Sequence, residues 1–469
     1  MTINENYNRL SHMDPVFLFA ENVFQNDFKS LPKKTINTTK RIILDSLGVA
    51  LAGRHSKECN VLIEMAQYWE GRAESTIIGV NKKVPSPIAA LVNGTMIQAL
   101  DFDETHDLSG AHSASCVLPA TLALGETKKT SGRQLICAVA LGIDLACRLG
   151  LTCKEKIGWT STSVYGCFGG AAAAAKILEL SEDKIRHSLG IVLSQASGTT
   201  QTAIDTPLSK HMQSGFASKA GVLSAILAER GTTGVQNVFE GKFGFFNLYK
   251  SGKYHREVLL QDLGTQFEID HLSLKPFPCC RATHGPIGAV GLLLEEGAIK
   301  IEDISLIEVT VPNVAYDLAG HPFSPGENPV ISAQFSIPYT VAAMLVFRKI
   351  SLETFDLEAI YDPRIHDLIK RIKVEEALSE TNGFAPAMVR IRMAKGMVYS
   401  KTVKTLMGDA NNPMGDDELV GKFISCVKFG TPEMPREEID RLIDMLMNLE
   451  DMQDISELTR SLRFDVVKH

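Results

Sequence analysis

Residues 93–126 read NGTMIQALDFDETHDLSGAHSASCVLPATLALGE. Apolar residues recur at helical spacing up to Leu100, and the same spacing returns from Leu118 onward. The loop between these two segments holds Asp101, Thr105, His106 and His112. Carboxylates and imidazoles are costly to place beside a hydrophobic core unless they pair with one another or serve a substrate. We therefore predict that this loop forms the centre of a functional site.

The overall charge restricts the kind of partner. The chain of 469 residues has 22% charged residues and a formal net charge of −7, and its length suits two or three domains. Nucleic acids and anionic membranes bind basic surfaces, which an acidic chain does not favour. We expect a small-molecule substrate, with no nucleic acid and no membrane as partner.

The cysteines and the first residues indicate a compartment. The nine cysteines lie mostly in apolar runs and form neither a CxxC pair nor a regular framework, which favours reduced thiols over disulfides. The opening MTINENYNRL has no apolar signal core. No segment reaches the roughly 18 uninterrupted apolar residues of a membrane span. We expect a cytoplasmic protein.

Helical spacing dominates the first part of the chain. Predicted helices begin at Pro15 and Pro32 and continue to about residue 268, with many small residues among them. The segment GGAAAAAKILEL at 169–180 contains five consecutive alanines, which indicates helices that pack closely.

The helical spacing is then interrupted by segments in which apolar and polar residues alternate, as they do in strands. The predicted strands lie at 267–274, 306–312 and 388–403, the last read as two strands around Lys395-Gly396. Helical spacing resumes after Asn412-Pro413. We predict a mainly α fold with an α+β domain: a large helical domain formed by residues 1–268 and 409–469, with an α+β lid domain at 269–408 inserted between them. The cleft between the two is the default place for a site.

The loop cluster at 101–112 allows three interpretations. It could be a helix-capping network, but capping needs one or two such side chains rather than six. It could be a metal site, yet the loop lacks a helical HxxxH pair and no third ligand motif stands out. We favour an acid–base or substrate-binding role and assign no metal.

Two further segments can bind an anion. Lys210 precedes a helix that starts near Gly215 and can bind a carboxylate, although a solvated surface lysine fits the sequence equally well. The hydroxyl-rich turn GWTSTSVYG at 158–166 enters the alanine-rich helix, whose N-terminus can also receive an anion. This turn is no phosphate loop, because it has neither GxxxxGK nor GxGxxG.

The segment KPFPCCRATHGPIGAV at 275–290 combines positive charge with a histidine. Lys275 and Arg281 supply the charge, and His284 directly precedes a glycine and a predicted helix. A nucleophilic cysteine at 279 or 280 would need a partner base, but the local sequence signatures of papain-like enzymes are absent. We favour packing thiols beside a substrate-binding loop.

Taken together, these segments resemble the MmgE/PrpD family. This family includes 2-methylcitrate dehydratases, cis-aconitate decarboxylases and an iminodisuccinate epimerase. The resemblance rests on segments that follow the family order over nearly the whole chain: RIILDSLGVALAG, NGTMIQALDFDETH, HSASCVLPATLALGE, GWTSTSVYGCFGGAAAAAKILEL, SKHMQSGFASKAG, KPFPCCRATHGPI, AQFSIPY and NNPMGDDELVGKF.

The resemblance implies a fold and a set of site residues. Family members combine a helical domain from both chain ends with an α+β lid, are usually homodimers, and work without a metal or an organic cofactor. Family active-site positions fall on Asp101, Thr105, His112, Lys210 and Lys275, with Tyr316 of VPNVAY at a further one. We predict His112, Asp101, Lys210 and Lys275 as catalytic residues. We predict Thr105, Arg281, His284, Tyr316, Thr160 and His106 as substrate-binding residues.

One position departs from the family pattern. The family commonly has a histidine after Gly-Trp or Gly-Phe, counted with the catalytic set in decarboxylase-type members, and Thr160 stands there in this chain. Threonine has no pKa near neutrality and cannot replace a histidine as an acid or base. His106, His211 or His284 could compensate, or the reaction could differ.

The residues and the resemblance together leave three hypotheses. The first is a cofactor-independent lyase, a dehydratase or decarboxylase, that moves a proton next to a carboxylate of a small di- or tricarboxylate such as 2-methylcitrate or cis-aconitate. The second is an epimerase or isomerase of a related dicarboxylate, iminodisuccinate-like, because one proton carrier with a lysine suits such a reaction. The third is a homologue that has lost catalysis, against which the joint presence of the four predicted catalytic residues speaks.

Overall fold

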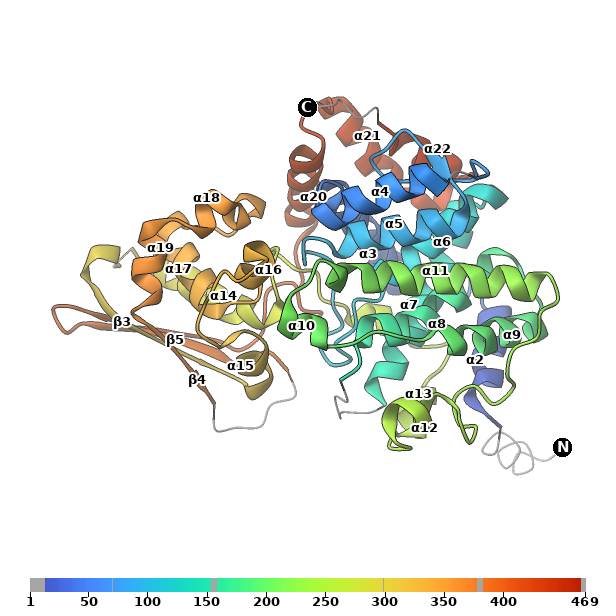
Figure 1. Cartoon of the computed structure of the whole chain (residues 1–469), viewed down its shortest axis with the longest axis horizontal. Helices are drawn as coiled ribbons and strands as arrows, with labels where there is room; N and C mark the ends of the chain where they lie inside the picture. Colours follow the sequence, from blue (N-terminus) through green and yellow to red (C-terminus); the bar gives the residue numbers. More distant parts are fainter. Residues whose placement is uncertain (1–12, 70, 153–157, 298, 378–382, 465–469) are drawn as a thin grey trace.

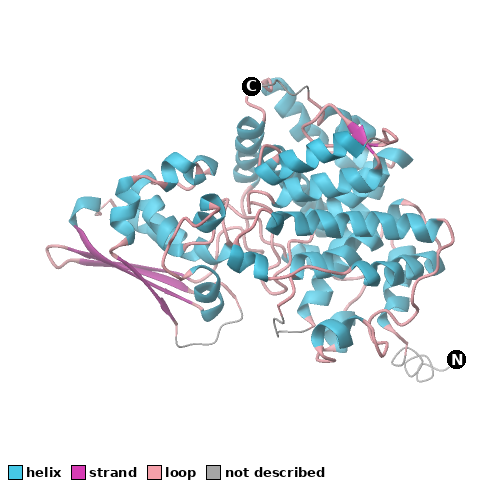
Figure 2. Cartoon of the chain, in the orientation of Figure 1, coloured by secondary structure: helices cyan, strands magenta, loops and turns pink. Residues whose placement is uncertain are grey.

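A helical domain and a smaller α+β lobe lie side by side in the computed structural model (Figures 1 and 2). The structure describes residues 13–69, 71–152, 158–297, 299–377 and 383–464. Helices predominate, and the strands of the one larger sheet lie in the lobe. The predicted class, mainly α with an α+β part, is confirmed.

The helical domain draws on both ends of the chain. Phe19 near the start and Phe423 near the end are buried in the same hydrophobic core. The N-terminal part contains α2 (Pro15–Gln25), α3 (Lys33–Gly53), α4 (Lys57–Trp69), α5 (Ser86–Gln98), α6 (Ala114–Lys128), α7 (Gly132–Leu151), α8 (Ser161–Ile177), α9 (Glu182–Val192), α10 (Gln201–Asp205), α11 (Ser209–Glu229), α12 (Phe245–Lys250) and α13 (Arg256–Leu260), with a short hairpin of β1 (Ser75–Thr76) and β2 (Lys83–Val84). The C-terminal part contains α20 (Asp416–Gly430), α21 (Arg436–Met447) and α22 (Ser456–Ser461).

Small residues let the central helices approach closely, as the alanine run predicts. A Cβ atom added to Gly221 of α11 would lie 2.6 Å from the carbonyl carbon of Gly170 in α8. A Cβ added to Gly94 of α5 would lie 2.9 Å from the Cα of Gly215 in α11. Side chains larger than hydrogen do not fit at these crossings, so the helix axes can come together. The helix α7 is long and apolar enough to cross a membrane, but 89% of its apolar stretch is buried inside the molecule, as in a core helix.

The lobe is a four-stranded sheet with helices on one face. Its strands are β3 (Ile304–Val311), β4 (Ile372–Glu376), β5 (Ala387–Met393) and β6 (Val398–Val403), in the order β4-β3-β5-β6. The β3–β4 pair is parallel and the other two pairs are antiparallel. Its helices are α14 (Arg281–Glu295), α15 (Asn313–Ala319), α16 (Pro329–Gln334), α17 (Ile337–Phe347), α18 (Leu357–Ile360) and α19 (Pro363–Ile369). Buried and exposed residues alternate along β5, as expected when only one face of a sheet is covered.

The predicted strand at 267–274 is wrong. Residues Glu268–His271 form a 3-10 helix, η2, inside the helical domain. The backbone N–H of Glu268 donates to Asp144 Oδ1 at 2.8 Å, and Thr35 Oγ1 donates to Asp270 Oδ2 at 2.8 Å. A short apolar alternation is ambiguous by itself, and these contacts from α7 and α3 decide the conformation. Leu274 is buried in the hydrophobic core of the helical domain, and Cys279 is buried in the hydrophobic core of the lobe. The chain therefore passes from one core to the other between these two residues.

Candidate active site

The loop after α5 is fixed from several sides. Asp101 adopts φ 51°, a left-handed conformation that is uncommon for a residue with a side chain. The backbones of Thr105 and Ser273 exchange hydrogen bonds of 2.9 and 2.8 Å. From α20, Lys422 Nζ donates to the carbonyl oxygen of Phe102 at 2.8 Å. Backbone strain of this kind persists only where the surroundings impose it, and it concentrates at functional sites.

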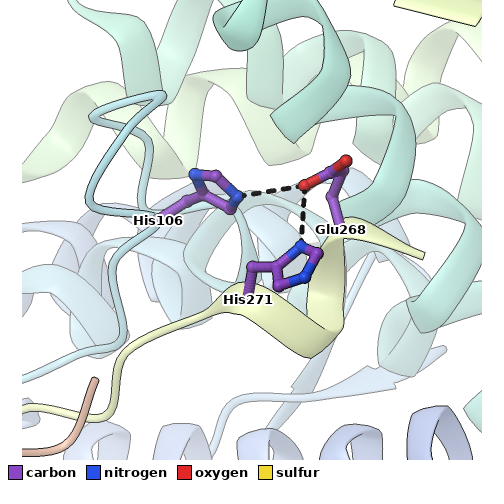
Figure 3. A group of neighbouring side chains, drawn as sticks. All are labelled: His106, Glu268 and His271. Atoms are coloured by element: carbon purple, nitrogen blue, oxygen red, sulfur yellow. Dashed lines mark hydrogen bonds and ion pairs between the residues drawn. The ribbon is translucent and has the colours of Figure 1, made fainter. Parts of the chain in front are cut away.

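His106 ties this loop to η2 through Glu268 (Figure 3). His106 Nε2 and His271 Nδ1 lie 3.3 and 3.1 Å from the same oxygen, Glu268 Oε2. The N–H of Ser109 donates to His106 Nδ1 at 3.1 Å, so Nε2 is the nitrogen that carries hydrogen and donates to Glu268. Burial opposes the charge on Glu268, but the hydrogen bonds from both histidines hold its pKa well below the usual range. The cluster anchors the loop.

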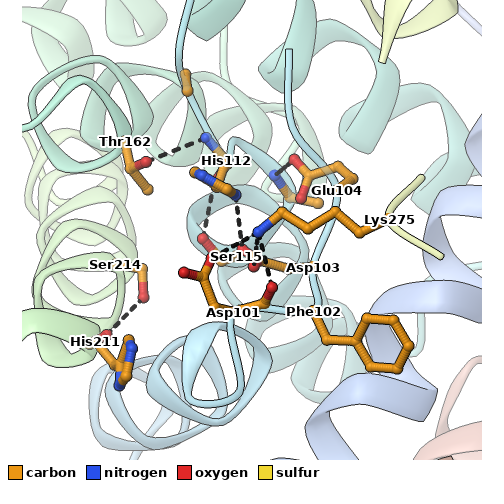
Figure 4. Close-up of polar contacts among 12 residues, drawn as sticks. Asp101, Phe102, Asp103, Glu104, His112, Ser115, Thr162, His211, Ser214 and Lys275 are labelled. Atoms are coloured by element: carbon orange, nitrogen blue, oxygen red, sulfur yellow. Dashed lines mark hydrogen bonds and ion pairs between the residues drawn. The ribbon is translucent and has the colours of Figure 1, made fainter. Parts of the chain in front are cut away.

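Asp101 is the centre of a buried charge group (Figure 4). Lys275 Nζ donates to its Oδ1 at 2.6 Å, and Lys210 Nζ lies 3.8 Å from its Oδ2. Burial disfavours the ionised carboxylate, but the charges of Lys275 and Lys210 outweigh burial and hold the pKa of Asp101 well below the usual range. Burial likewise disfavours the Lys275 ammonium, but Asp101 and Asp103 raise its pKa to about 12. Asp101 and Lys275 therefore both stay ionised at neutral pH.

His112 faces a carboxylate on its buried side (Figure 4). Its Nδ1 lies 3.3 Å from Asp103 Oδ2, and its side chain is 19% exposed. Burial lowers the pKa of His112, but the charge of Asp103 outweighs this and the net result is a raised pKa. Among the described residues, no protein group forms a hydrogen bond with Nε2. His112 therefore has one nitrogen oriented by a carboxylate and the other free for a substrate, as an acid–base residue requires.

Glu104 lies behind this pair as a neutral acid. Its side chain is fully buried, and Oε1 accepts a hydrogen bond of 2.8 Å from the N–H of Ala114. Burial and the charge of Asp103 raise the pKa of Glu104 to about 8. The carboxyl groups of Asp103 and Glu104 thus carry different charges at neutral pH, although they are neighbours in the chain.

A cavity of about 250 Å³ opens over these groups, at the junction of the helical domain and the lobe. Leu318, Phe335 and Phe384 of the lobe contribute apolar wall. The predicted residues that line the cavity are Asp101, Thr105, His112, Thr160, Lys210, Lys275 and Arg281. Its size and its combination of cations with one imidazole suit a small polyanionic molecule.

Two family profiles match this chain. The MmgE/PrpD N-terminal domain covers residues 18–257, and the MmgE/PrpD C-terminal domain covers residues 277–448. The chain belongs to the MmgE/PrpD family. The resemblance seen in the sequence segments is confirmed.

Curated relatives from this family align over nearly the whole chain. The cis-aconitate decarboxylase of Aspergillus terreus is 27% identical over 473 residues, which cover 96% of this chain and 95% of that protein. The cis-aconitate decarboxylase of Homo sapiens is 28% identical over 451 residues, 92% of this chain and 91% of that protein. The Mus musculus enzyme of the same name is 28% identical over 445 residues, 91% of this chain and 89% of that protein.

Three predicted substrate-binding residues lie outside the cavity wall of this MmgE/PrpD enzyme. His106 is held behind the loop by Glu268. Tyr316 lies half-buried on α15, with its ring 5.4 Å from that of His321. His284 is buried in α14, where its Nε2 lies 3.2 Å from the carbonyl oxygen of Cys279. Burial and the charge of Arg281 lower the pKa of His284 well below its usual range, so it is neutral.

Arg281 lines the cavity, but other groups of the protein already bind its guanidinium. Its guanidinium lies 3.3 Å from Asp107 Oδ2 and donates to the carbonyl oxygen of Met407 at 2.8 Å. His284 Nδ1 lies 3.3 Å from the same guanidinium. Arg281 therefore fixes the wall of the cavity and has less capacity for a substrate carboxylate than Lys210.

Thr160 lies in the cavity wall, at the position where the family resemblance led us to expect a histidine. It precedes the first turn of α8, and its Oγ1 donates to Gln213 Oε1 at 3.2 Å. Gln213 in turn accepts from the N–H of Thr199 at 2.7 Å and donates to Thr202 Oγ1 at 2.8 Å. This wall is polar and uncharged. His211, a candidate to compensate, lies outside the cavity and binds Glu58 at 2.7 Å.

The donor groups of this MmgE/PrpD site do not fit a resident metal well. Asp103, Glu104 and His112 are close enough to share an ion, and so are His106, Glu268 and His271. In the first group, Lys275 Nζ lies 3.8 Å from Asp103 Oδ1 and already supplies positive charge. In the second, the hydrogen on His106 Nε2 occupies the position where a metal would bind. These arrangements favour ion pairs over coordination.

The adjacent cysteines are not activated. Cys280 lines the cavity, and burial raises its pKa to about 11. Burial raises the pKa of Cys279 as well, and its Sγ lies 3.1 Å from Thr283 Oγ1. Neutral thiols are poor nucleophiles, which agrees with a packing role.

Several cavity residues were not among the predicted site residues. Gln98, Trp159, Gln213 and Lys250 all line the cavity. Gln98, Trp159 and Gln213 lie within segments that carry the family resemblance and could have been included on that ground. Lys250 lies in no recognised segment, and no local pattern marks it.

Proposed function

We propose that this MmgE/PrpD enzyme is a lyase that decarboxylates a small unsaturated tricarboxylate of the cis-aconitate type. The whole-length similarity to cis-aconitate decarboxylases supports this reaction. The cavity supports it as well, because Lys210, Lys275 and His112 meet there.

The observation that carries the choice of reaction is the number of imidazoles. Within the described part of the chain, His112 is the one histidine that lines the cavity. Dehydration needs a base for the C–H proton and an acid for the leaving hydroxyl, whereas decarboxylation needs one proton for the carbanion that the loss of CO2 leaves. A site with a single strong proton carrier therefore disfavours dehydration of a 2-methylcitrate-like acid, and the whole-length similarity to cis-aconitate decarboxylases supports decarboxylation instead.

The proposed step uses groups already positioned by the fold. The bond between the carbon and the departing carboxylate breaks, its electron pair stays on the substrate, and a proton from His112 forms the new C–H bond. Lys210 and Lys275 stabilise the charge that develops on a neighbouring carboxylate. Asp103 stabilises the protonated form of His112, and solvent returns the proton after each turnover.

Proton NMR of the reaction in D2O tests this proposal. The substrate panel contains cis-aconitate, citrate, 2-methylcitrate, malate and iminodisuccinate. We expect CO2 release from cis-aconitate, with one deuteron in the product. Water loss from a hydroxy acid without any CO2 release, or no turnover of any compound, would contradict the proposal.

An epimerase or isomerase is the second candidate. A single histidine can remove a proton and return it, and Lys210 and Lys275 stabilise the intermediate equally well. The same experiment separates the two reactions, because deuterium exchange at a stereocentre without loss of CO2 or water identifies the isomerase. A homologue without catalysis is disfavoured by the ionised group at Asp101 and the oriented His112.

Three further properties belong to this proposal. The enzyme works without a metal or an organic cofactor, so dialysis against EDTA should leave its rate unchanged, and a loss restored by added metal would contradict this. It is a homodimer, which light scattering coupled to size-exclusion chromatography tests. It is cytoplasmic, in agreement with the buried free thiols of the described cysteines, and fractionation of cells tests this location.

A further inference from the structure

Lys250, at the end of α12, is a buried cation beside the cavity. Its side chain is 7% exposed and lines the cavity. Its Nζ lies 5.2 Å from the centroid of the Tyr165 ring. Among the described residues, no carboxylate or carbonyl oxygen pairs with this ammonium group. Within the described part of the molecule, this charge faces the Tyr165 ring and the cavity.

The other buried lysines that the structure describes differ from Lys250, because each of them has a carboxylate partner. Within the described part of the chain they are Lys40, Lys275 and Lys422. Each has a carboxylate oxygen close to its Nζ, at 2.7, 2.6 and 2.7 Å respectively. A buried ammonium without such a partner destabilises the fold, so its presence beside a cavity indicates that a ligand supplies the missing negative charge.

Lys250 is held rigidly in this position. Phe245 and Phe246 of the same helix are fully buried in the hydrophobic core. Tyr249 packs against Phe245 and Trp159, with centroid distances of 5.1 and 4.9 Å. These aromatic contacts fix the short helix, so Lys250 does not need to be ordered when an anion binds.

We propose that Lys250 forms a second carboxylate subsite, separate from the one at Lys210 and Lys275. This assignment rests on the proposed lyase function and specifies its substrate class. Lys210 and Lys275 bind the carboxylate next to the reacting carbon, Lys250 binds a second carboxylate that does not react, and the one lost as CO2 is a third. The preferred substrate is therefore a tricarboxylate rather than a dicarboxylate.

Calorimetric titration with tricarballylate, a saturated tricarboxylate that cannot be decarboxylated in this way, tests the subsite without catalysis. We expect Lys250→Met to weaken binding by about 10- to 100-fold, the loss of one charge pair in a partly desolvated site. Lys250→Arg should keep most of the affinity because it keeps the charge. Lys242→Met is the matched control: Lys242 is exposed, lies 5.3 Å from the Phe243 ring and does not line the cavity.

The stability of the variant separates a binding role from a structural role. Removal of an unpaired buried charge should leave the Tm of Lys250→Met equal to or above that of the wild type, and Lys250→Gln serves as a second neutral variant. Wild-type affinity in both neutral variants, or no binding of tricarballylate by the wild type, overturns the subsite. Lys250-dependent binding without CO2 release from any tricarboxylate keeps the subsite and overturns the proposed decarboxylation.

Discussion

Lys275 Nζ lies 2.6 Å from Asp101 Oδ1, although 174 residues separate the two in the chain. Lys275 precedes the core of the lobe, and Asp101 lies in the loop after α5 of the helical domain. Both side chains are almost completely buried. This pair therefore joins the two parts of the molecule at the place where the cavity opens.

Breaking this pair should destabilise the protein. Lys275→Met leaves the Asp101 carboxylate buried with only the more distant Lys210, and we expect a loss of about 3 kcal/mol in the free energy of unfolding. Urea denaturation measures this change. The double variant Asp101→Asn/Lys275→Met should recover much of the loss, since it removes both charges. Equal stability of Lys275→Met and the wild type would show that the pair does not stabilise the fold.

His112 and Asp103 should control the pH dependence of turnover. His112→Asn should reduce kcat by at least about 100-fold, the usual contribution of a general acid. Asp103 raises the pKa of His112, so the protonated and active form of the wild type persists to higher pH. Asp103→Asn should therefore move the alkaline fall in kcat toward lower pH. An unchanged pH profile in this variant would contradict the pairing.

Glu104 should make the stability depend on pH. Its pKa is about 8 in the folded protein, above the ordinary glutamate value of 4.5, so the folded state binds this proton more tightly than the unfolded chain. Its contribution to stability is complete below pH 4.5 and is lost as the pH rises through about 8. Glu104→Gln removes this dependence while keeping an acceptor for Ala114. The Tm of the variant relative to the wild type should rise between pH 5 and pH 9, and a constant difference would contradict the raised pKa.

Thr160 should contribute much less to catalysis than a histidine that acts as an acid or base would contribute. A hydroxyl group that donates to Gln213 cannot act as an acid or base near neutral pH. Thr160→Val should change kcat by less than about 10-fold, well below the effect of a general acid. Steady-state kinetics beside His112→Asn provide the comparison. A loss as large as that of His112→Asn would give Thr160 a direct role in the reaction.

The spacing of residues within single segments was sufficient to predict most of the helices and strands. The helices predicted to begin at Pro15 and Pro32 correspond to α2, whose first residue is Pro15, and to α3, whose N-cap residue is Pro32. The two strands predicted around Lys395-Gly396 correspond to β5 and β6. The strand β4 was not predicted, because IKVEE is short and pairs in parallel with the distant β3.

The sequence by itself determined the helical and strand periods, the family, and the segments that carry Asp101, His112, Lys210 and Lys275. These follow from residue spacing and from motifs that a single segment contains. Only the tertiary structure decided that His284 donates to a backbone carbonyl outside the cavity wall and that Lys250 is buried beside the cavity with no carboxylate partner among the described residues. The physical reason is that the charge state and availability of an ionisable side chain depend on its burial and on partners far away in the chain.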